Sequence, residues 1–520
     1  MPSFDTRVPA VLVRLDPNPF HHGTLGAARS LGRAGIAVHA VVESPASPVV
    51  RSRYLRRAHQ RPAEPSPAEL TRLLHRIADE IDAETDDASG RSDDGPAERE
   101  ARDDGRLIPL PDLRTDLRTG LRTDHRTDHR TDLRPDHHPD HHPERPDRPD
   151  RPQRPARQAL LVPLDDITAL ALAECRPELA DRFLLPDQSP EQLTRVADKA
   201  QLAETCRALA LPHPRTELPA SADEAAAMAW SLGLPVIAKW SRPWLLPVGG
   251  GLRSTTIVGS LAEVRELYAR APQAGSRLLL QELLPAGRGL DWFFHGYVDS
   301  AGGCSTGATG IKERSWPDGA GLTAVGRWTA NPVVDATARE LLSALGYRGV
   351  CDLDFRLDRT TGAYHLVDFN PRPGAQFRLF ADRDGLDVVR AMHLDLTGRP
   401  VPAHHPSYGR RFFVENYAAL SYLTAPGRRH TAGPPGTGGT RGREPGGGEA
   451  AWFAADDPRP ALAMMRAWFA HVLRKGLLTL RRLTRLLARR LLRAGGPRPV
   501  ATVPAPQPPP RTTDDRMTQR

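Results

Sequence analysis

The pattern of apolar and polar positions is clearest between residues 346 and 374. Residues 350–357 and 363–369 each combine apolar and strand-forming side chains, and the segment between them is Asp-Arg-Thr-Thr-Gly. Strand formers on both sides of a short polar turn predict a β-hairpin. Because alternate side chains of a strand share one face, the polar residues of this hairpin are expected to gather on one surface.

Those polar residues suggest a metal site. Asp352 and Asp354 lie two positions apart on the first strand, and Asp368 and Asn370 lie two apart at the end of the second. With suitable register, Asp354, Asp368 and Asn370 would offer three oxygen ligands to Mg²⁺, or to Mn²⁺. Arg372 follows, and its guanidinium suits a phosphate or a carboxylate. The spacing alone fits equally well a hairpin whose carboxylates face water.

A second pattern, near the N-terminus, alternates strands with a helix. Residues 10–15 and 36–42 are apolar and strand-like, and residues 24–33 between them predict a helix that follows a Gly-bearing turn. Strand, helix and strand in this order predict a βαβ unit with a parallel sheet. The apolar run 159–163 predicts a further strand of the same domain.

Residues 84–157 differ in kind from the rest of the chain. They contain near-repeats of Arg and Asp with Thr, His and Pro, and they contain no Phe, Trp or Tyr. A mixed-charge segment with nothing to form a core predicts a disordered insertion in the N-terminal domain. Its paired histidines offer ligands to a transition metal, although a low-complexity repeat without that role fits better. These histidines are His137, His138, His141 and His142.

Residues 234–240 predict a buried strand that contains Lys239. A Lys in an apolar strand needs an anionic partner to offset its burial, and a phosphate would serve. The loop that follows is rich in glycine, which frees backbone N–H groups to wrap phosphates, although a flexible linker has the same composition. Its candidate residues are Gly249, Gly250, Gly251 and Ser254.

The hairpin resembles the metal-binding hairpin of the ATP-grasp superfamily. In that family the second strand ends in an acidic residue, an apolar residue, Asn, Pro and Arg, here Asp368-Phe-Asn370-Pro-Arg372. The first strand carries Asp before Phe, here Asp354-Phe355. The family usually has Glu where this chain has Asp368. The shorter side chain of Asp would change how the two metal ions are bridged. The resemblance extends from about residue 189 to residue 398.

The resemblance implies a fold and a role for each site residue. The implied fold class is α/β, with an N-terminal parallel-sheet domain before an α+β ATP-grasp domain that holds ATP between two sheets. Asp354, Asp368 and Asn370 would bind the metal, and Arg372 and Lys312 would act in catalysis. The residues expected to bind ATP are Lys199, Lys239, Gly249, Gly250, Gly251, Ser254 and Lys312 at the phosphates, Glu282, Leu283 and Leu284 at the adenine, and Asp291 at the ribose.

The implied activity is that of an ATP- and Mg²⁺-dependent carboxylate–amine ligase. A carboxylate, by family an amino acid or small acid, would take the γ-phosphoryl group of ATP, and an amine would displace phosphate to give an amide. The partners are then small molecules, and a homodimer is compatible with the family. Two alternatives stay open. One is a nucleotide-binding protein without catalysis, tethered by its C-terminal helix; the other is an RNA- or membrane-surface protein.

Composition limits the class of protein further. The 520 residues include 51 Pro and 43 Gly and are 39% hydrophobic, which indicates that part of the chain is not packed. The cysteines are far apart and form no CxxC pair, which argues against a disulfide framework or zinc site and fits a reducing cytoplasm. We find no signal-peptide core at the N-terminus and no apolar run of ~20 residues. The cysteines are Cys175, Cys206, Cys304 and Cys351.

The net charge of +8 is concentrated near the C-terminus, where residues 459–493 predict a basic amphipathic helix. Leucines at three- and four-residue spacing share one face of its last part, and arginines fill the other. The charge does not imply nucleic-acid binding by the main domains, because the remainder of the chain is near neutral. The helix fits an anionic membrane, a partner or the protein's own body. The leucines are Leu473, Leu477, Leu480, Leu483, Leu487 and Leu491.

These patterns predict the organisation of the whole chain. The N-terminal domain occupies residues 1–187, with the insertion at about 84–157, and the ATP-grasp domain occupies residues 188–400. A partly disordered linker, the basic helix and a disordered tail follow at 401–458, 459–496 and 497–520. Further strands are predicted at 276–282, 290–299, 303–312 and 410–417, a helix at 332–345, and a disordered stretch at 426–449.

Overall fold

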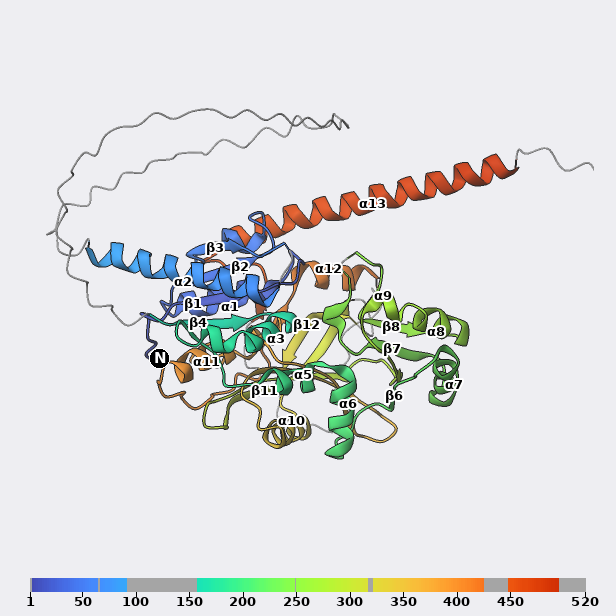
Figure 1. Cartoon of the computed structure of the whole chain (residues 1–520), viewed down its shortest axis with the longest axis horizontal. Coiled ribbons are helices and arrows are strands. Elements are labelled where there is room, and N and C mark those ends of the chain that lie inside the picture. Colours follow the sequence, from blue (N-terminus) through green and yellow to red (C-terminus); the bar gives the residue numbers. More distant parts are fainter. Residues whose placement is uncertain are drawn as a thin grey trace, which may run out of the picture. The chain divides into compact units, whose positions relative to one another are not determined.

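A computed structural model describes residues 2–63, 66–90, 157–247, 249–316, 321–424 and 448–494. The chain divides into two units, Met1–Leu74 with Gln158–Arg520, and His75–Arg157. All three sheets of the described residues belong to the first unit (Figure 1). Most of the predicted insertion, including its paired histidines, and the whole predicted C-terminal tail lie outside the described residues.

The N-terminal part contains a five-stranded sheet of order β3-β2-β1-β4-β5, in which every pairing is parallel. Its central strands are buried and apolar, as expected for a parallel sheet covered on both faces. The βαβ prediction is confirmed, and β4 lies directly beside β1. The strands are β1 Ala10–Val13, β2 Val38–Val42, β3 Arg57–Gln60, β4 Ala159–Pro163 and β5 Phe183–Leu184; the helices are α1 His22–Arg33, η1 Pro48–Arg51, α2 Pro67–Gly90, α3 Asp166–Glu174 and α4 Arg176–Leu179.

A four-stranded antiparallel sheet of order β6-β9-β7-β8 follows. Helices α7 and α8 cover one of its faces, because Ala225, Ala229 and Val264 pack with Val236 and Trp240 in one apolar cluster. The strands are β6 Thr216–Glu217, β7 Val236–Trp240, β8 Thr255–Val258 and β9 Leu278–Glu282; the helices are α5 Pro190–Ala197, α6 Lys199–Ala208, α7 Ala222–Leu232, η2 Pro243–Leu245, α8 Leu261–Tyr268 and α9 Ala271–Ala274.

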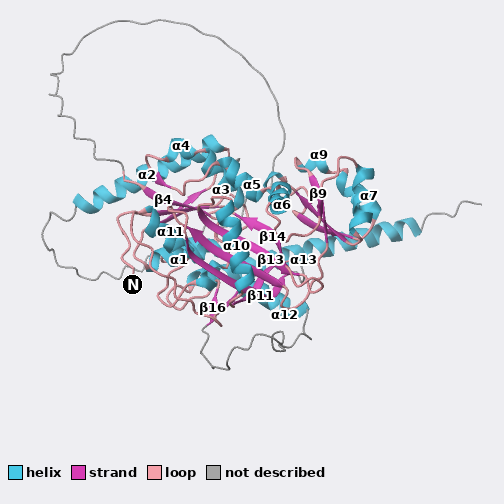
Figure 2. Ribbon diagram, turned by 90° about the horizontal axis from the view of Figure 1, so that it is seen from below, coloured by secondary structure: helices cyan, strands magenta, loops and turns pink. Residues whose placement is uncertain are grey.

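The largest sheet has seven strands in the order β14-β13-β10-β11-β12-β15-β16. Helix α10 covers one face (Figure 2), where Val334 and Leu341 pack with Phe294 of β10. Helix α11 covers the other, where Met392 packs with Tyr297. The strands are β10 Asp291–Val298, β11 Cys304–Trp316, β12 Leu322–Trp328, β13 Gly349–Leu357, β14 Tyr364–Asn370, β15 Arg411–Phe413 and β16 Gly448–Ala450; the helices are α10 Pro332–Ala344, η3 Phe377–Phe380, α11 Val388–Leu396 and α12 Glu415–Thr424.

The predicted hairpin is confirmed as β13 and β14, which pair antiparallel. Its register sets Asp354 opposite Asp368 and Asp352 opposite Asn370. The register shifts between Asp354 and Phe355, at a bulge directly after the first of these pairs. All four polar side chains therefore lie at one end of the hairpin.

One prediction near the C-terminus is wrong, and a second is tested only at its last two residues. The strand predicted over residues 410–417 ends at Phe413 as β15, and α12 begins at Glu415, whose carboxylate accepts hydrogen bonds from the backbone N–H groups of Trp452 and Phe453. Of the stretch predicted to be disordered, residues 426–447 lie outside the described residues, whereas Gly448 and Glu449 belong to strand β16, which pairs parallel with β15.

The predicted C-terminal helix is α13, Arg459–Ala494, the long red helix of Figure 1. Its first turns pack on the N-terminal part of the chain, because Ala461 and Met464 are buried in a cluster with Val49 of η1. Among the described residues, no helix is both long enough and apolar enough to cross a membrane.

Candidate functional site

A cavity of about 1280 Å³ is lined by residues from all three sheets. The four-stranded sheet contributes Lys239 and Glu282, and the seven-stranded sheet contributes Lys312 together with the polar end of the hairpin. The parallel sheet contributes residues that follow the carboxyl ends of β1 and β4, where ligands bind in open α/β sheets. Separate parts of the chain thus meet in one polar chamber.

The hairpin carboxylates are each paired with a lysine from another element. Lys312 Nζ of β11 lies 2.8 Å from Asp354 Oδ1, and Lys199 Nζ forms an ion pair with Asp368 Oδ1. Burial raises the pKa of Asp354, and the Lys312 charge offsets this only in part. Burial lowers the pKa of Lys199, but Asp368 and Asp166 together outweigh burial, so the net shift of the pKa is upward. Four residues predicted from the sequence therefore meet in two charge pairs.

Lys239 reaches the same place from β7. Val236, Ala238 and Trp240 point into the apolar cluster under α7, so strand alternation turns Lys239 to the opposite face. Its Nζ donates to the carbonyl oxygen of Val367 on β14 at 3.0 Å. Burial lowers the pKa of this lysine to about 8, opposed by the charge of Asp368. A partly buried cation without a close carboxylate suits an anionic ligand.

Lys199 is positioned by a capping interaction at the start of α6. Asp198 is the N-cap residue; its Oδ1 accepts from the N–H of Ala200 and from Ser241 Oγ, and its Oδ2 accepts from Arg242 Nε. The N–H of Lys199 donates to the carbonyl of Ser241, directly after β7. This network fixes the first turn of α6 against the strand that carries Lys239.

The sequence did not single out Asp352 as a site residue. Asp352 lies 2.9 Å from His295 Nε2 on the neighbouring strand β10 and 3.0 Å from Arg372 Nη1. Burial opposes its ionisation, but His295, Arg372 and Lys312 outweigh burial and lower the pKa of Asp352 to about 2. Only the alternation of Asp352 with Asp354 could have indicated its place, because the partners come from distant segments.

Arg372 also links the hairpin to the parallel sheet. Its Nε lies 3.3 Å from Asp166 Oδ1, at the start of α3 after β4. Burial raises the pKa of Asp166 in spite of Arg372 and Lys199. Arg372 therefore lies between two carboxylates, Asp352 and Asp166, at the cavity wall.

The proposed adenine and ribose residues have protein partners of their own. Glu282 Oε1 accepts from the N–H of Arg215 at 2.8 Å, and Asp291 Oδ1 accepts from Arg356 Nε at 2.7 Å. Arg356, on β13, lines the cavity and was not predicted. Glu282, Leu284, Asp291 and Ser254 line the cavity.

The structure does not bring every predicted residue to the cavity. The lining residues do not include Gly249, Gly250, Gly251 or Leu283. Gly249 and Gly251 have φ of 79° and 71°, a backbone region that favours glycine. The three glycines of the loop therefore do not line the cavity, while Ser254, at the end of the loop, does.

The donor set of the hairpin fits Mg²⁺. Asp354 and Asp368 face one another across the strand pair, and each forms its ion pair with a lysine through Oδ1. Two carboxylates and an amide supply hard oxygen ligands. A divalent cation would stabilise the ionised form of Asp354, which burial disfavours. Asn370 lines the same cavity.

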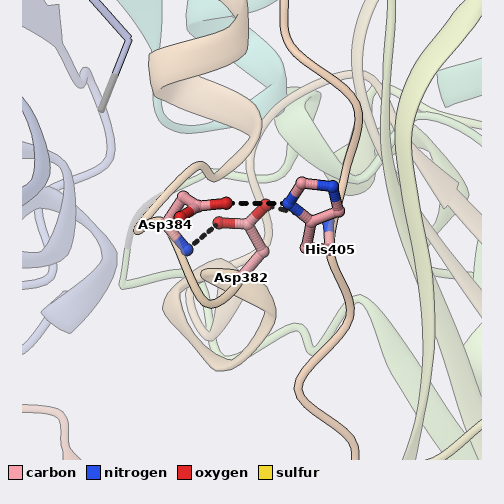
Figure 3. A group of neighbouring side chains, drawn as sticks. All are labelled: Asp382, Asp384 and His405. Carbon is pink, nitrogen blue, oxygen red and sulfur yellow. Dashed lines mark hydrogen bonds and ion pairs between the residues drawn. The ribbon is translucent and has the colours of Figure 1, made fainter.

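A second group of possible ligands lies outside the cavity and fits a structural role. Asp382, Asp384 and His405 approach one another (Figure 3). Asp382 Oδ1 accepts from the N–H groups of Asp384 and Leu386, and its Oδ2 accepts from the N–H of His405. The Asp382 carboxylate is thus used to shape a loop, and Asp384 and His405 form an exposed pair at 2.8 Å.

Comparisons with known proteins give distant matches. No family model matches the chain. The N-terminal section of the carbamoyl phosphate synthase large chain of Methanopyrus kandleri is 23% identical over 214 residues, which are 39% of this chain. The match spans 36% of that relative, about a third of its length.

Solved structures with a similar arrangement include two from bacteria. Biotin carboxylase from Campylobacter jejuni has a TM-score of 0.48 and 13% identity, over 78% of this chain and 74% of that one. L-amino acid ligase from Bacillus licheniformis has a TM-score of 0.48 and 10% identity, over 78% of each chain.

The order of the sheets is the one that the ATP-grasp resemblance predicts: a parallel N-terminal sheet, then an antiparallel four-stranded sheet, then a larger, mostly antiparallel sheet with the hairpin β13–β14 at its edge. The predicted fold class is thereby confirmed. Within this class the particular reaction is a matter for proposal.

Proposed function

We propose that this protein is an ATP- and Mg²⁺-dependent ligase that joins a carboxylate to an amine through an acyl phosphate. One observation carries the proposal: a single cavity collects lysines from three elements around the polar end of the hairpin. Lysines at such a place suit phosphates, and the hairpin supplies oxygen ligands for a divalent cation. The residues are Lys199, Lys239, Lys312, Asp354, Asp368, Asn370 and Arg372.

In the proposed reaction, a carboxylate oxygen of the acid attacks the γ-phosphorus of ATP, and the bond from that phosphorus to the ADP oxygen breaks. The amine nitrogen then attacks the acyl carbon, phosphate leaves, and the nitrogen loses a proton. Little covalent work is left to the protein, so positioning and charge neutralisation dominate.

The residues divide this work by their place in the cavity. Lys239 and Lys312 would neutralise phosphate oxygens, and Arg372 would hold the acid beside them. Asp354, Asp368 and Asn370 would hold Mg²⁺, which supplies further charge neutralisation at the phosphates. When ligands arrive, Lys199 and Lys312 would exchange carboxylate partners for phosphate. The acid remains an amino acid or small acid, as the family resemblance implies.

The test is a hydroxylamine trap on the full-length chain. With ATP, Mg²⁺ and a pool of carboxylic acids, we expect a hydroxamate to form together with ADP, because hydroxylamine intercepts an acyl phosphate. ATP binding with neither product would contradict the ligase and support a nucleotide-binding protein without catalysis.

The Asp368→Asn variant tests the site directly. We expect ADP formation to fall about a hundredfold or more, since one ligand charge at the phosphates is lost. The matched control is Asp223→Asn, an exposed Asp on α7 outside the cavity, which should keep wild-type turnover. Wild-type-like turnover by Asp368→Asn would refute the metal assignment.

A further inference from the structure

The first half of α13 has one face that packs on the body of the protein. Ala461 and Met464 are buried, and Trp468 packs against the same cluster. His471 meets Phe20 edge-on, with 5.8 Å between ring centroids. These positions recur at three- and four-residue spacing, so they form one helical stripe. The body therefore covers this stripe and fixes the orientation of the helix.

A second apolar stripe on the same turns is not covered. Leu462 is 53% exposed, Phe469 59% and Leu473 66%. Most members of this stripe come one residue after a body-facing position. Since one residue corresponds to a rotation of roughly 100° about the helix axis, the second stripe lies beside the body-facing stripe. Its members are Leu462, Met465, Phe469, Val472 and Leu473. An exposed apolar stripe of this length indicates an interaction surface.

The sequence continues this stripe to the end of the helix. Leucines occur at positions 477, 480, 483, 487 and 491, which keep the three- and four-residue spacing. Across residues 459–494 there is no Asp or Glu. The basic residues are Arg459, Arg466, Arg474, Lys475, Arg481, Arg482, Arg485, Arg489, Arg490 and Arg493. Besides the stripe that packs on the body, the sequence of the helix thus combines a second set of regularly spaced apolar residues with basic residues and no acidic ones.

We infer that α13 lays this stripe on an anionic lipid surface. An amphipathic helix with a basic polar face binds in the interface plane through apolar burial and attraction to anionic headgroups. A second copy of the helix would bring like charges together along the whole length, which opposes self-association. This inference is independent of the proposed ligase activity, because none of the α13 side chains that the structure describes lines the cavity.

Vesicle flotation of the full-length chain tests the inference. We expect the protein to float with vesicles of phosphatidylcholine and phosphatidylserine and to remain in the bottom fraction with phosphatidylcholine vesicles alone. High salt should release it from the anionic vesicles. The triple variant Leu462→Ser, Phe469→Ser, Leu473→Ser should lose about tenfold or more of the binding. The matched control changes three apolar residues of similar exposure on other elements, Trp230→Ser, Ile257→Ser and Val333→Ser, and should float like wild type.

Three outcomes would overturn the inference. One is failure of the wild-type chain to float with anionic vesicles. Another is equal flotation of wild type and the triple variant, which would place lipid contact elsewhere. The third is a wild-type oligomer in light scattering that the triple variant loses, without vesicle binding, which would make the stripe a protein interface.

Discussion

At the scale of single residues, burial ties the charge of Lys239 to the pH. Burial lowers its pKa to about 8, so it loses its proton as the pH rises through that value. Phosphates bind the protonated lysine, and ATP affinity should therefore be high below pH 8 and fall above it. Titration calorimetry across about pH 6 to pH 10 would measure this change.

Lys239→Arg is the control for this prediction. Arginine stays charged throughout the range, so the pH dependence of ATP affinity should flatten in the variant. A wild-type affinity that does not change across pH 8 would show that Lys239 does not contact the nucleotide.

Single residues also show how far sequence can predict a site. Asp354, Asp368 and Asn370 were predicted because strand alternation and a short motif lie within one hairpin. Asp352 and Arg356 were missed because their partners, His295 and Asp291, lie on β10, and only the register between β10 and β13 brings them together. Pairing between segments that are far apart in sequence is set by the whole sheet.

At the scale of elements, Gly374 decides how closely the chain after the hairpin approaches β10. A Cβ at this position would lie 2.3 Å from His295 Cε1 and 2.8 Å from Asp352 Cγ. Gly374→Ala should therefore displace the His295–Asp352 pair and lower the free energy of unfolding by about 1–3 kcal/mol, as overpacking does. Urea unfolding followed by circular dichroism would measure the loss.

Gly259→Ala is the matched control for Gly374→Ala. Its nearest neighbour would be a flexible carboxylate oxygen of Glu263 at 3.9 Å, so stability should change little. Equal stability of the two variants would mean that the chain near Gly374 relaxes without cost.

Elements near the C-terminus were the hardest to predict. Strand β16 lies in a stretch with a disorder-like composition, but Glu449 forms ion pairs with Arg378 and Arg410, and Ala450 pairs with Phe413. Those partners come from segments before the glycine-rich stretch. The local sequence contains the residues but gives no sign of the contacts, so composition predicted disorder where tertiary pairing makes a strand.

At the scale of the whole first unit, residues 452–457 before α13 form ion-pair and hydrogen-bond contacts with helix α1. Arg29 of α1 and Asp457 are both buried, and Arg29 Nε lies 3.0 Å from Asp457 Oδ2. Arg29 Nη2 also donates to the carbonyl oxygens of Trp452 and Asp457. Ser52 Oγ and the N–H of Arg53 donate to the same carboxylate. The start of α13 thus depends on a polar network with the N-terminal sheet.

Asp457→Ala would leave the Arg29 charge buried without its carboxylate. Removing one member of a buried pair costs about 3–5 kcal/mol, so urea unfolding should show a large loss of stability. The neighbouring variant Asp456→Ala removes a partly exposed pair with Arg33, 42% exposed on the Asp side, and should cost about 1 kcal/mol or less. If both variants unfold at the same urea concentration, the buried network does not hold α13 to the parallel sheet. If only Asp457→Ala is destabilised, the contact between the two ends of the chain is a cooperative part of the fold.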